Sequence, residues 1–600
     1  MGAMAEYSAP LRDMRFALEH LADLAGVVAL PGFDHVDADA VHSILEENAR
    51  FMEDLVAPLN RIGDVQGSVR NDDGTVTTPE GFAAAYKAYV DAGWGGVSFP
   101  PEYGGGGFPW LVAIAMQEIL TSANMAFSMC PLLNQGAIDM LLHHASEEHR
   151  ETYLPKMITG EWTGTMNLTE PHAGSDVGAL TTRAVPQSDG SYRITGTKIF
   201  ISFGEHDMSE NIIHLVLART PSAPPGTKGI SCFIVPKYLL DDDGTPGERN
   251  DVTCVSIEHK MGIKASPTCV LSYGEQGEGA VGYLIGEENA GMRYMFTMMN
   301  NARLSVGLEG LSLSERARQM AVAYAKERRQ GRAPGAPAGE QSPIVDHPDV
   351  RRMLLTMQAS IEALRGVIYL NAAALDRASH AADEADRAAG AELADLLTPV
   401  SKAWGTDLGV ELTSLAIQVY GGMGYIEETG VAQHFRDARI APIYEGTNGI
   451  QAMDLVGRKL PMRAGGAIGD FLARIDALDA DLAAAGDDLA SIRSRLADGV
   501  AALRTATDWL LANGMANPLD ALAGATPYLR LFSVVTGAWT MARQALAASA
   551  ALADAGPADK AFYEGKVLTA RFFCEQLLPP ALGLVPSITA TNRDLAAASF

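Results

Sequence analysis

The sequence predicts an α+β protein that is mostly α-helical, with helices before and after a central antiparallel β region. Three observations carry this prediction. Apolar residues recur at three- and four-residue spacing in the first and last thirds of the chain. Between about 165 and 286, short β-rich runs separated by turn residues replace that spacing. The 600 residues are too many for one ordinary core, so several packed units are expected.

The segment 4–164 is predicted to be an N-terminal helical domain with an extension. Within His42–Asp64, five apolar side chains fall close to one helix face: Ile44, Leu45, Phe51, Leu55 and Leu59. Proline and glycine in FPPEYGGGG (99–107) interrupt this spacing, which then resumes in LVAIAMQEIL (111–120). We exclude Met1–Ala3 because it looks like an expression scar.

A β-rich domain is predicted over 165–287. Its four main runs are SYRITGTKIFIS (191–202), NIIHLVLART (211–220), GISCFIVPK (229–237) and VTCVSIEHK (252–260). Valine, isoleucine, threonine and aromatic residues favour strands, and the Gly, Pro and Asp clusters between the runs favour turns. Because no helix-length segment separates the runs, we predict an antiparallel sheet or small barrel and no Rossmann sheet.

Helical spacing returns over 288–462, predicted to be a helical bundle, and continues over 463–600, predicted to be an additional C-terminal helical domain. Five apolar side chains share one face of the helix predicted over 401–422: Trp404, Leu408, Leu412, Leu415 and Val419. The pair Gly421-Gly422 is a natural stop for that helix. The Pro/Gly-rich segment 331–348 is predicted to be a surface loop between two helices.

The composition, 47% hydrophobic and 20% charged residues, is that of a soluble globular protein. A formal net charge of −27 repels phosphate backbones, so we expect no nucleic-acid binding, although a local basic pocket for a phosphorylated cofactor is compatible with it. The five cysteines are scattered, which argues for a reducing compartment and against a zinc site. No apolar run reaches the ~18 residues that span a bilayer, and no signal-peptide core is recognised, so we expect a cytoplasmic protein without metal ligands.

Four segments carry residues suited to a ligand. They are MNLTEPHAGSDVGAL (166–180), KIFISFG (198–204), YAKERRQGR (324–332), and QVYGGMGYIEETG together with FRDARIAPIYEGTNGIQ (within 418–451). The first suits a loop whose backbone amides reach a ligand. In the second, Phe200 and Ser202 would share one strand face and meet a flat ring, although an ordinary core strand also fits. The arginines of the third suit either a pyrophosphate or simply a helix C-terminus.

Glu445 stands behind the mostly apolar run IAPIY and directly before Gly446. A carboxylate among apolar neighbours is costly unless its charge is paired or used. Glu-Gly-Thr-Asn-Gly is also ordinary turn chemistry, so a solvated turn residue is an alternative at this point. The fixed order of the four segments and the short interval between the glycine turn and Glu445 favour a functional carboxylate.

In this order, around a β region flanked by helices, the four segments resemble the acyl-CoA dehydrogenase family over roughly 51–460. The helical extension and the additional C-terminal helices resemble the large bacterial branch of that family. The resemblance implies a cytoplasmic homodimer that binds FAD, oxidises an acyl-CoA to trans-2-enoyl-CoA and passes electrons to electron-transfer flavoprotein. It leaves the substrate open between a fatty acyl-CoA and 3-methylmercaptopropionyl-CoA.

The resemblance also implies roles for single residues. Glu445 would remove the alpha proton of the thioester while the beta hydride goes to flavin N5. Arg303, Gly446 and Ser175 would contact the substrate, and the stretch Asn301–Arg303 offers no competing carboxylate. Cofactor contacts are implied for Met166, Leu168, Thr169, Gly174, Ser175, Phe200, Ser202, Arg328, Gln418, Gly421, Gly422 and Thr447. Family members often have tryptophan and threonine at the positions of Phe200 and Ser202, and the family pattern assigns no role to Arg329 and Arg332.

Other functions stay open. An acyl-CoA oxidase would share the fold, but such oxidases tend to carry Asp after the Glu-Gly pair, where this chain has Thr447. A flavin monooxygenase or a non-catalytic flavin-binding module would not need Glu445, Arg303 and the glycine turn together. The amphipathic segment 529–552 lacks the lysine-rich face of membrane-surface helices, so we expect a buried bundle helix there and no membrane association.

Overall fold

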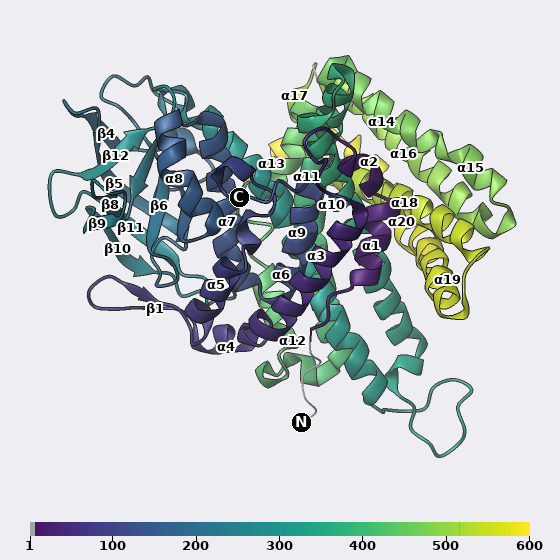
Figure 1. Ribbon diagram of the computed structural model, residues 1–600. Helices are drawn as coiled ribbons and strands as arrows, with labels where there is room; N and C mark the ends of the chain where they lie inside the picture. The colour runs from purple at the N-terminus through teal and green to yellow at the C-terminus, as the bar shows by residue number, and fades with distance from the viewer. Residues whose placement is uncertain (1–6, 515) are drawn as a thin grey trace. The chain divides into compact units, whose positions relative to one another are not determined.

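The computed structural model describes residues 7–514 and 516–600, and its ribbon is shown in Figure 1. The excluded segment Met1–Ala3 and the predicted domain start at residue 4 lie outside the described residues. The chain forms two compact units. Unit 1 contains the chain up to Ala49 together with 109–122 and 303–600, and unit 2 contains 50–108 and 123–302. The predicted fold class is confirmed, since helices predominate and one large sheet lies in the middle of the chain.

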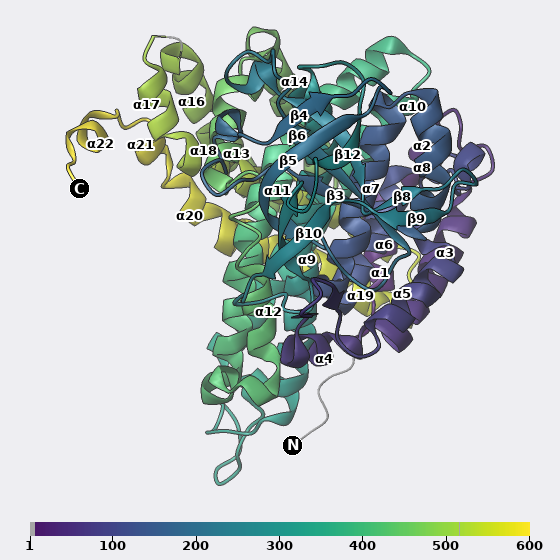
Figure 2. The ribbon, with the colours of Figure 1, turned by 90° about the vertical axis from the view of Figure 1, so that its left-hand side faces the viewer.

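An eight-stranded sheet forms the centre of unit 2 (Figure 2). Its strands are β3 (Trp162–Asn167), β4 (Arg183–Pro186), β5 (Tyr192–Ser202), β6 (Asn211–Ala218), β7 (Ser231–Pro236), β10 (Val252–Ile257), β11 (Thr268–Tyr273) and β12 (Ala280–Leu284). The order is β10-β11-β5-β12-β7-β6-β3, with β4 paired to β5. Two hairpins accompany the sheet, formed by β1 (Val69–Arg70) with β2 (Val76–Thr77) and by β8 (Tyr238–Leu240) with β9 (Pro246–Arg249).

The four strand runs predicted from the sequence correspond to β5, β6, β7 and β10. The pairs in the sheet are antiparallel, as predicted, except that β3 runs parallel to β6. The sequence does not predict β3 and instead assigns its first residues to the helical region. All but one of the residues of β3 are buried, so no polar alternation marks the strand.

Helices cover the sheet of unit 2 and close its core. They are α4 (Leu59–Gln66), α5 (Phe82–Asp91), α7 (Met125–His144), α8 (Glu147–Thr159) and the first turns of α9 (Gly291–Glu327). Side-chain oxygens of Asn124 and Ser146 cap the N-termini of α7 and α8, where backbone N–H groups lack helical partners. Apolar side chains from α7, α8, α9 and the sheet meet in one core that includes Leu141, Met157, Trp162, Ile213 and Met295.

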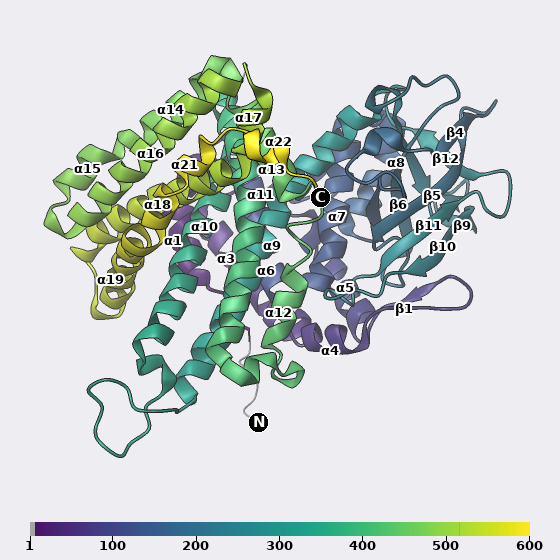
Figure 3. The same cartoon turned by 180° about the vertical axis from the view of Figure 1, so that it is seen from behind.

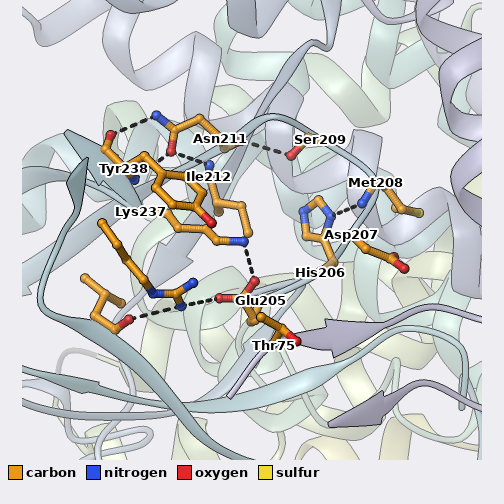
Figure 4. Close-up of polar contacts among 12 residues, drawn as sticks. Thr75, Glu205, His206, Asp207, Met208, Ser209, Asn211, Ile212, Lys237 and Tyr238 are labelled. Atoms are coloured by element: carbon orange, nitrogen blue, oxygen red, sulfur yellow. Dashed lines mark hydrogen bonds and ion pairs between the residues drawn. The ribbon is translucent and has the colours of Figure 1, made fainter. Parts of the chain in front are cut away.

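A polar network fastens the edge of unit 2 where β6, β7 and β8 meet (Figure 4). The buried carboxylate of Glu205 accepts hydrogen bonds from Lys237 and, at 2.8 Å, from Arg249. Asn211 donates to the Tyr238 carbonyl at 2.9 Å and accepts from the Tyr238 N–H at 3.0 Å. Burial of a charge is costly unless the charge is paired, and here the buried charges are paired. We therefore interpret the network as a structural link between the ends of these strands.

Helices of very different length build unit 1. They are α1 (Leu11–His20), α2 (Leu24–Val28), α3 (Ala38–Phe51), α6 (Trp110–Ala123), the rest of α9, α10 (Pro348–His380), α11 (Glu384–Tyr420), α12 (Val431–Ala438) and α13 (Asn448–Asp454). Four of the five apolar residues on the predicted face of α11 are buried and Leu415 is half-buried, so that prediction is confirmed. Gly421 ends α11 with a φ of 61°, a left-handed conformation that favours glycine.

A buried charge cluster connects α6, α9 and α10 inside unit 1. The guanidinium of Arg365 donates to Glu118 at 2.7 and 2.9 Å and lies 3.5 Å from Glu315. The hydroxyl of Tyr369 donates to the second oxygen of Glu118 at 2.6 Å. All four side chains are almost completely buried, so each charge depends on these partners for its solvation.

The C-terminal part of unit 1 is helical, as predicted, and is visible from behind in Figure 3. Its helices are α14 (Gly466–Asp476), α15 (Leu478–Ala484), α16 (Ala490–Gly514), α17 (Pro518–Ala523), α18 (Ala525–Leu552), α19 (Pro557–Phe572), α20 (Leu578–Leu582), α21 (Val585–Ile588) and α22 (Arg593–Ala597). Most residues of α18 are buried, which confirms the prediction of a bundle helix over 529–552. Among the described residues, no helix has the length and apolar character needed to cross a bilayer.

Candidate active site

The residues predicted to form the site fall into two sets, and each set lies within one unit. Unit 1 holds Arg303, Arg328, Gln418, Gly421, Gly422, Glu445, Gly446 and Thr447. Unit 2 holds Met166, Leu168, Thr169, Gly174, Ser175, Phe200 and Ser202. Each set has its own local geometry.

A tight turn over Ala441–Asn448 carries Glu445 from α12 to α13. Glu445 and Gly446 both have positive φ, 54° and 83°. A left-handed conformation costs a non-glycine residue about 1–3 kcal/mol and is found most often at functional sites. The positive φ of Gly446 favours glycine, and a Cβ there would lie 2.9 Å from Gln451 Nε2, whose side chain would have to shift. Thr447 caps α13 through its hydroxyl, which accepts the Ile450 N–H at 3.3 Å.

Two cations act on the half-buried carboxylate of Glu445. Burial raises the pKa of Glu445 to about 7, and the positive charges of Lys402 and Arg303 oppose that rise. Arg303 on α9 is only 6% exposed, and its guanidinium lies 3.7 Å from the position of a Cβ on Gly446. Because Glu445 is poorly solvated yet ionised above neutral pH, it is a stronger base than an exposed glutamate.

Lys402 on α11 fastens both ends of the turn that carries Glu445. Its buried ammonium donates to the Ala441 carbonyl and to Asn448 Oδ1, each at 2.9 Å. The amide of Asn448 in turn donates to Asp407 at 2.7 Å. Burial lowers the pKa of Lys402 to about 8, while the nearby carboxyls of Glu309 and Glu445 favour its charged form.

The middle of the turn is held from α9. The hydroxyl of Tyr444, the residue before Glu445, donates to Glu309 Oε2 at 2.5 Å. Glu309 is completely buried, and burial raises its pKa to about 8. This carboxyl group is therefore mainly uncharged at neutral pH.

The second part of the unit 1 set lies where the C-terminal ends of α9 and α11 meet. The rings of Tyr324 and Tyr420 stack with centroids 4.1 Å apart and planes 12° apart. Arg328 follows on the α9 side and is exposed, as are Gln418, Gly421 and Gly422 on the α11 side. A guanidinium, a side-chain amide and glycine peptides on one exposed edge form a donor set suited to a pyrophosphate.

In unit 2, the set surrounds the end of β5. The Ile199 N–H donates to the Thr169 carbonyl at 2.9 Å, so the loop after β3 lies along this strand. Phe200 has a φ of 60° at a register shift between β5 and β11, and its ring is 58% exposed. Ser202 is half-buried, while Gly174 and Ser175 are exposed in the loop. An exposed aromatic ring beside hydroxyl and peptide groups is a surface suited to a flat heterocycle.

A buried ion pair supports this surface from within unit 2. The ammonium of Lys198, fully buried on β5, donates to the Leu168 carbonyl and to Glu170, each at 2.9 Å. Glu170 also accepts from the hydroxyl and N–H groups of Thr181 and Thr182. Although burial opposes it, Lys198 and these hydrogen bonds lower the pKa of Glu170 to about 2. The pair fixes the loop that carries Leu168 and Thr169.

Sequence reasoning misses three residues of this arrangement, namely Glu309, Lys402 and Tyr444. Each charged member stands in an otherwise apolar helical stretch, Glu309 in VGLEGL and Lys402 in VSKAW. A buried charge in such a stretch needs a partner, and that is the signal that could have identified both residues. Their common partner, the turn around Glu445, begins 39 residues after Lys402 and 132 after Glu309, and its contacts follow only from the packing of α9 and α11.

Four profiles of one family cover most of the chain. They are the acyl-CoA dehydrogenase N-terminal domain (residues 40–161), middle domain (165–275) and C-terminal domain (289–460), and the acetyl-CoA dehydrogenase C-terminal-like domain (467–599). The chain belongs to the acyl-CoA dehydrogenase family. Several relatives match this acyl-CoA dehydrogenase almost from end to end. It is 47% identical to the 3-methylmercaptopropionyl-CoA dehydrogenase of Ruegeria pomeroyi, over 99% of this chain and 100% of the relative. It is 38% identical to a butyryl-CoA dehydrogenase of Syntrophomonas wolfei, over 99% of this chain and 98% of the relative.

A solved structure shares the fold of this acyl-CoA dehydrogenase. The Caenorhabditis elegans protein ACDH-11, in complex with C11-CoA, matches with a TM-score of 0.75 at 18% identity. The match covers 96% of this chain and 93% of that chain, so it includes the C-terminal helices. The profiles and the relatives confirm the sequence resemblance to the family, with its additional C-terminal part, and the solved structure confirms the fold.

Proposed function

We propose that this acyl-CoA dehydrogenase removes the alpha proton of an acyl-CoA thioester with the carboxylate of Glu445. The beta hydrogen leaves with its electron pair, a double bond forms between the alpha and beta carbons, and the product is a trans-2-enoyl-CoA. The observation that carries the proposal is the geometry of Glu445, a half-buried carboxylate in a left-handed conformation beside Arg303 and Lys402. A positioned base with a pKa near the working pH is what proton removal next to a thioester requires.

FAD is the cofactor of this family, and the residues of the chain fit it. When bound, FAD accepts the hydride from the beta carbon. The exposed ring of Phe200, with Met166, Leu168, Thr169, Gly174, Ser175 and Ser202 around it, would hold the isoalloxazine. The donors at the ends of α9 and α11, Arg328, Gln418, Gly421 and Gly422, would hold the ADP half, with Thr447 on the near side.

The residues around Glu445 prepare it to act as the base. Burial raises its proton affinity, whereas Arg303 and Lys402 keep enough of it ionised at neutral pH. Gly446, without a side chain, lets the thioester approach the backbone, and the N–H of Glu445 is the donor we propose for the thioester carbonyl. A preorganised donor of this kind is worth roughly 3–4 kcal/mol in other enzymes.

The substrate we propose is an acyl-CoA with a short chain. Two of the full-length relatives carry the names of 3-methylmercaptopropionyl-CoA and butyryl-CoA, whose acyl chains are both short. Ser175, Arg303 and Gly446 are the proposed contacts of this substrate. We further propose a cytoplasmic location, in line with the five buried free cysteines. We also propose that the protein is a homodimer and that electron-transfer flavoprotein is its electron acceptor.

Anaerobic bleaching of the visible flavin band tests this function. Acyl-CoAs from 3-methylmercaptopropionyl and butyryl to palmitoyl are mixed with the purified protein, and the rate of bleaching is recorded by stopped flow. We expect rapid bleaching that is fastest with the short acyl groups. A yellow protein that no acyl-CoA bleaches would contradict the function. Peroxide formed at the rate of turnover in air, without another acceptor, would identify an oxidase instead.

A further inference from the structure

Lys402 holds the two ends of the turn that presents Glu445, and its centre is held by other side chains. The ammonium of that lysine reaches Ala441 at one end and Asn448 at the other. The centre, directly beside the base, is held by the hydrogen bond from Tyr444 to Glu309 at 2.5 Å. Glu309 therefore holds the residue directly before Glu445, while Gln451 Nε2 donates to the carbonyl of Gly446, the residue directly after it, at 3.3 Å.

Glu309 makes this contact as a carboxyl group that is mainly uncharged at neutral pH. Its side chain is completely buried on α9, and its second oxygen, Oε1, has no hydrogen-bond partner among the described residues. An ionised carboxylate in such a place would lose most of its solvation, which is why burial raises the pKa of Glu309 to about 8. The titratable groups that act on Glu309 are Tyr444 and Glu445 on the turn and Lys402 on α11.

An uncharged acid has a physical advantage at this position. It accepts the hydrogen bond from Tyr444 as an ionised one would, but it places no second negative charge next to Glu445. A like charge there would raise the pKa of Glu445 further and leave less of the base ionised at neutral pH. Fixing the neighbouring residue matters because a base displaced by 1 Å costs roughly 100-fold in rate.

We propose that Glu309 is a positioning residue that fixes Tyr444, and through it the base Glu445, in the orientation needed for proton removal. The inference rests on the proposed function, since it takes Glu445 to be the base. It assigns to Tyr444 the role of a link and to Glu309 that of a neutral hydrogen-bond acceptor. Glutamine is neutral and has the same length, so it should take over the role of Glu309. Leucine cannot accept a hydrogen bond and should not.

The test compares Glu309→Gln, Glu309→Leu and Tyr444→Phe as full-length, flavin-loaded enzymes. Butyryl-CoA reduces each enzyme anaerobically in a stopped-flow instrument between pH 6 and pH 9. We expect Glu309→Gln to reduce within about threefold of the unaltered enzyme, and Glu309→Leu and Tyr444→Phe to be about 10- to 100-fold slower at saturation. The concentration of butyryl-CoA for half-maximal rate should change less than threefold, because binding does not use this hydrogen bond.

The pH profile separates positioning from a purely structural role. The acidic limb of the profile reports the titration of Glu445. If Glu309 is uncharged near pH 7, Glu309→Gln does not shift this limb. If Glu309 is charged, removing it lowers the pKa of Glu445 and moves the limb to lower pH, which overturns the proposal. Reduction by Glu309→Leu at the unaltered rate, or a loss in Glu309→Gln as large as in Glu309→Leu, also overturns it. Should Glu309→Leu not fold, the other two variants decide.

Asp376→Asn is the matched control. Asp376 is a buried carboxyl group of unit 1 with a pKa raised by burial to about 7, and it accepts the N–H groups of Trp110 and Leu111 at the start of α6. Its replacement should lower the stability and leave the profile of flavin reduction unchanged. Failure of the proposed function gives a different result from failure of this inference. If Glu445→Gln keeps its turnover, Glu445 is not the base, whatever the Glu309 variants do.

Discussion

The ammonium of Lys402 lies 2.9 Å from Asn448 Oδ1 and so ties α11 to the first residue of α13, directly after the turn that carries Glu445. The same ammonium bonds the carbonyl of Ala441 at the start of the turn. One buried cation therefore does two things for the base. It fixes the backbone on both sides of Glu445, and its charge lowers the pKa of that carboxyl.

Lys402→Met is expected to move the acidic limb of the pH profile for flavin reduction above pH 7. Removing the cation removes an influence that lowers the pKa of Glu445, so the base is protonated at a higher pH than before. At pH 7 we expect reduction to slow by roughly tenfold, the effect of about 1.4 kcal/mol. Lys87→Met, at an exposed lysine on α5, is the control and should change neither quantity. A limb that stays in place or moves to lower pH in Lys402→Met would show that the cation does not act on the base.

Phe200→Ala is expected to weaken flavin binding without unfolding the protein. The ring of Phe200 is 58% exposed, so its loss removes little from the core of unit 2. Loss of an aromatic contact with the flavin is expected to raise its dissociation constant about tenfold, or ~1.4 kcal/mol. The measurements are the flavin content after dialysis and the thermal midpoint of the apoprotein. Unchanged flavin retention in Phe200→Ala would show that the Phe200 ring does not contact the flavin.

Lys198→Met is expected to destabilise unit 2 and to loosen the flavin. The substitution leaves Glu170 buried without its cation, and breaking a buried pair on one side typically costs about 3–5 kcal/mol. Because folding lowers the pKa of Glu170 to about 2, the pair stabilises the protein above the ordinary carboxyl range, and this contribution is lost as the pH falls towards 2. Chemical denaturation followed by flavin release and by circular dichroism measures both effects. Arg504→Met, at an exposed ion pair on α16, is the control and should have little effect.

Arg328→Ala and Glu445→Gln are expected to complement each other in mixed dimers. The family resemblance implies that, in the proposed homodimer, Arg328 reaches the flavin of the neighbouring subunit, whereas Glu445 serves the flavin of its own. A mixed dimer then has one site with both native residues and should regain up to about half of the native activity. The two variants, each weakly active alone, are mixed under subunit-exchange conditions and assayed with butyryl-CoA. No recovery in dimers shown to be mixed would place Arg328 at its own subunit's flavin, or at none.

Much of the fold follows from the periodicity of the sequence. The long helices and the strands β5, β6, β7 and β10 show clear helical or turn-bounded patterns, and the structure contains them. The sequence does not predict β3, a short and almost entirely buried strand without alternation, and its parallel pairing with β6 joins two segments that are distant along the chain. The bounds of the four predicted domains stay predictions.

Part of the candidate site is likewise predicted from the sequence, and part is recognised only in the structure. Glu445, Arg303 and the residues around β5 are found from the sequence because they lie in short segments with a recognisable order. Glu309 and Lys402 are found only in the structure, because their partners come from the packing of α9 and α11 around a distant turn. Local sequence predicts Glu445 as the proposed base, and tertiary structure shows which side chains hold its turn.

The most direct test of the account is anaerobic flavin reduction by butyryl-CoA in Glu445→Gln. Glutamine keeps the shape of the side chain but cannot accept the alpha proton. We predict a yellow enzyme that retains FAD and binds butyryl-CoA yet bleaches at least about 1,000-fold more slowly, a loss of ~4 kcal/mol. Glu411→Gln, at an exposed glutamate of α11, should bleach at the native rate. Reduction of Glu445→Gln within tenfold of the native rate would contradict the assignment of Glu445 as the base.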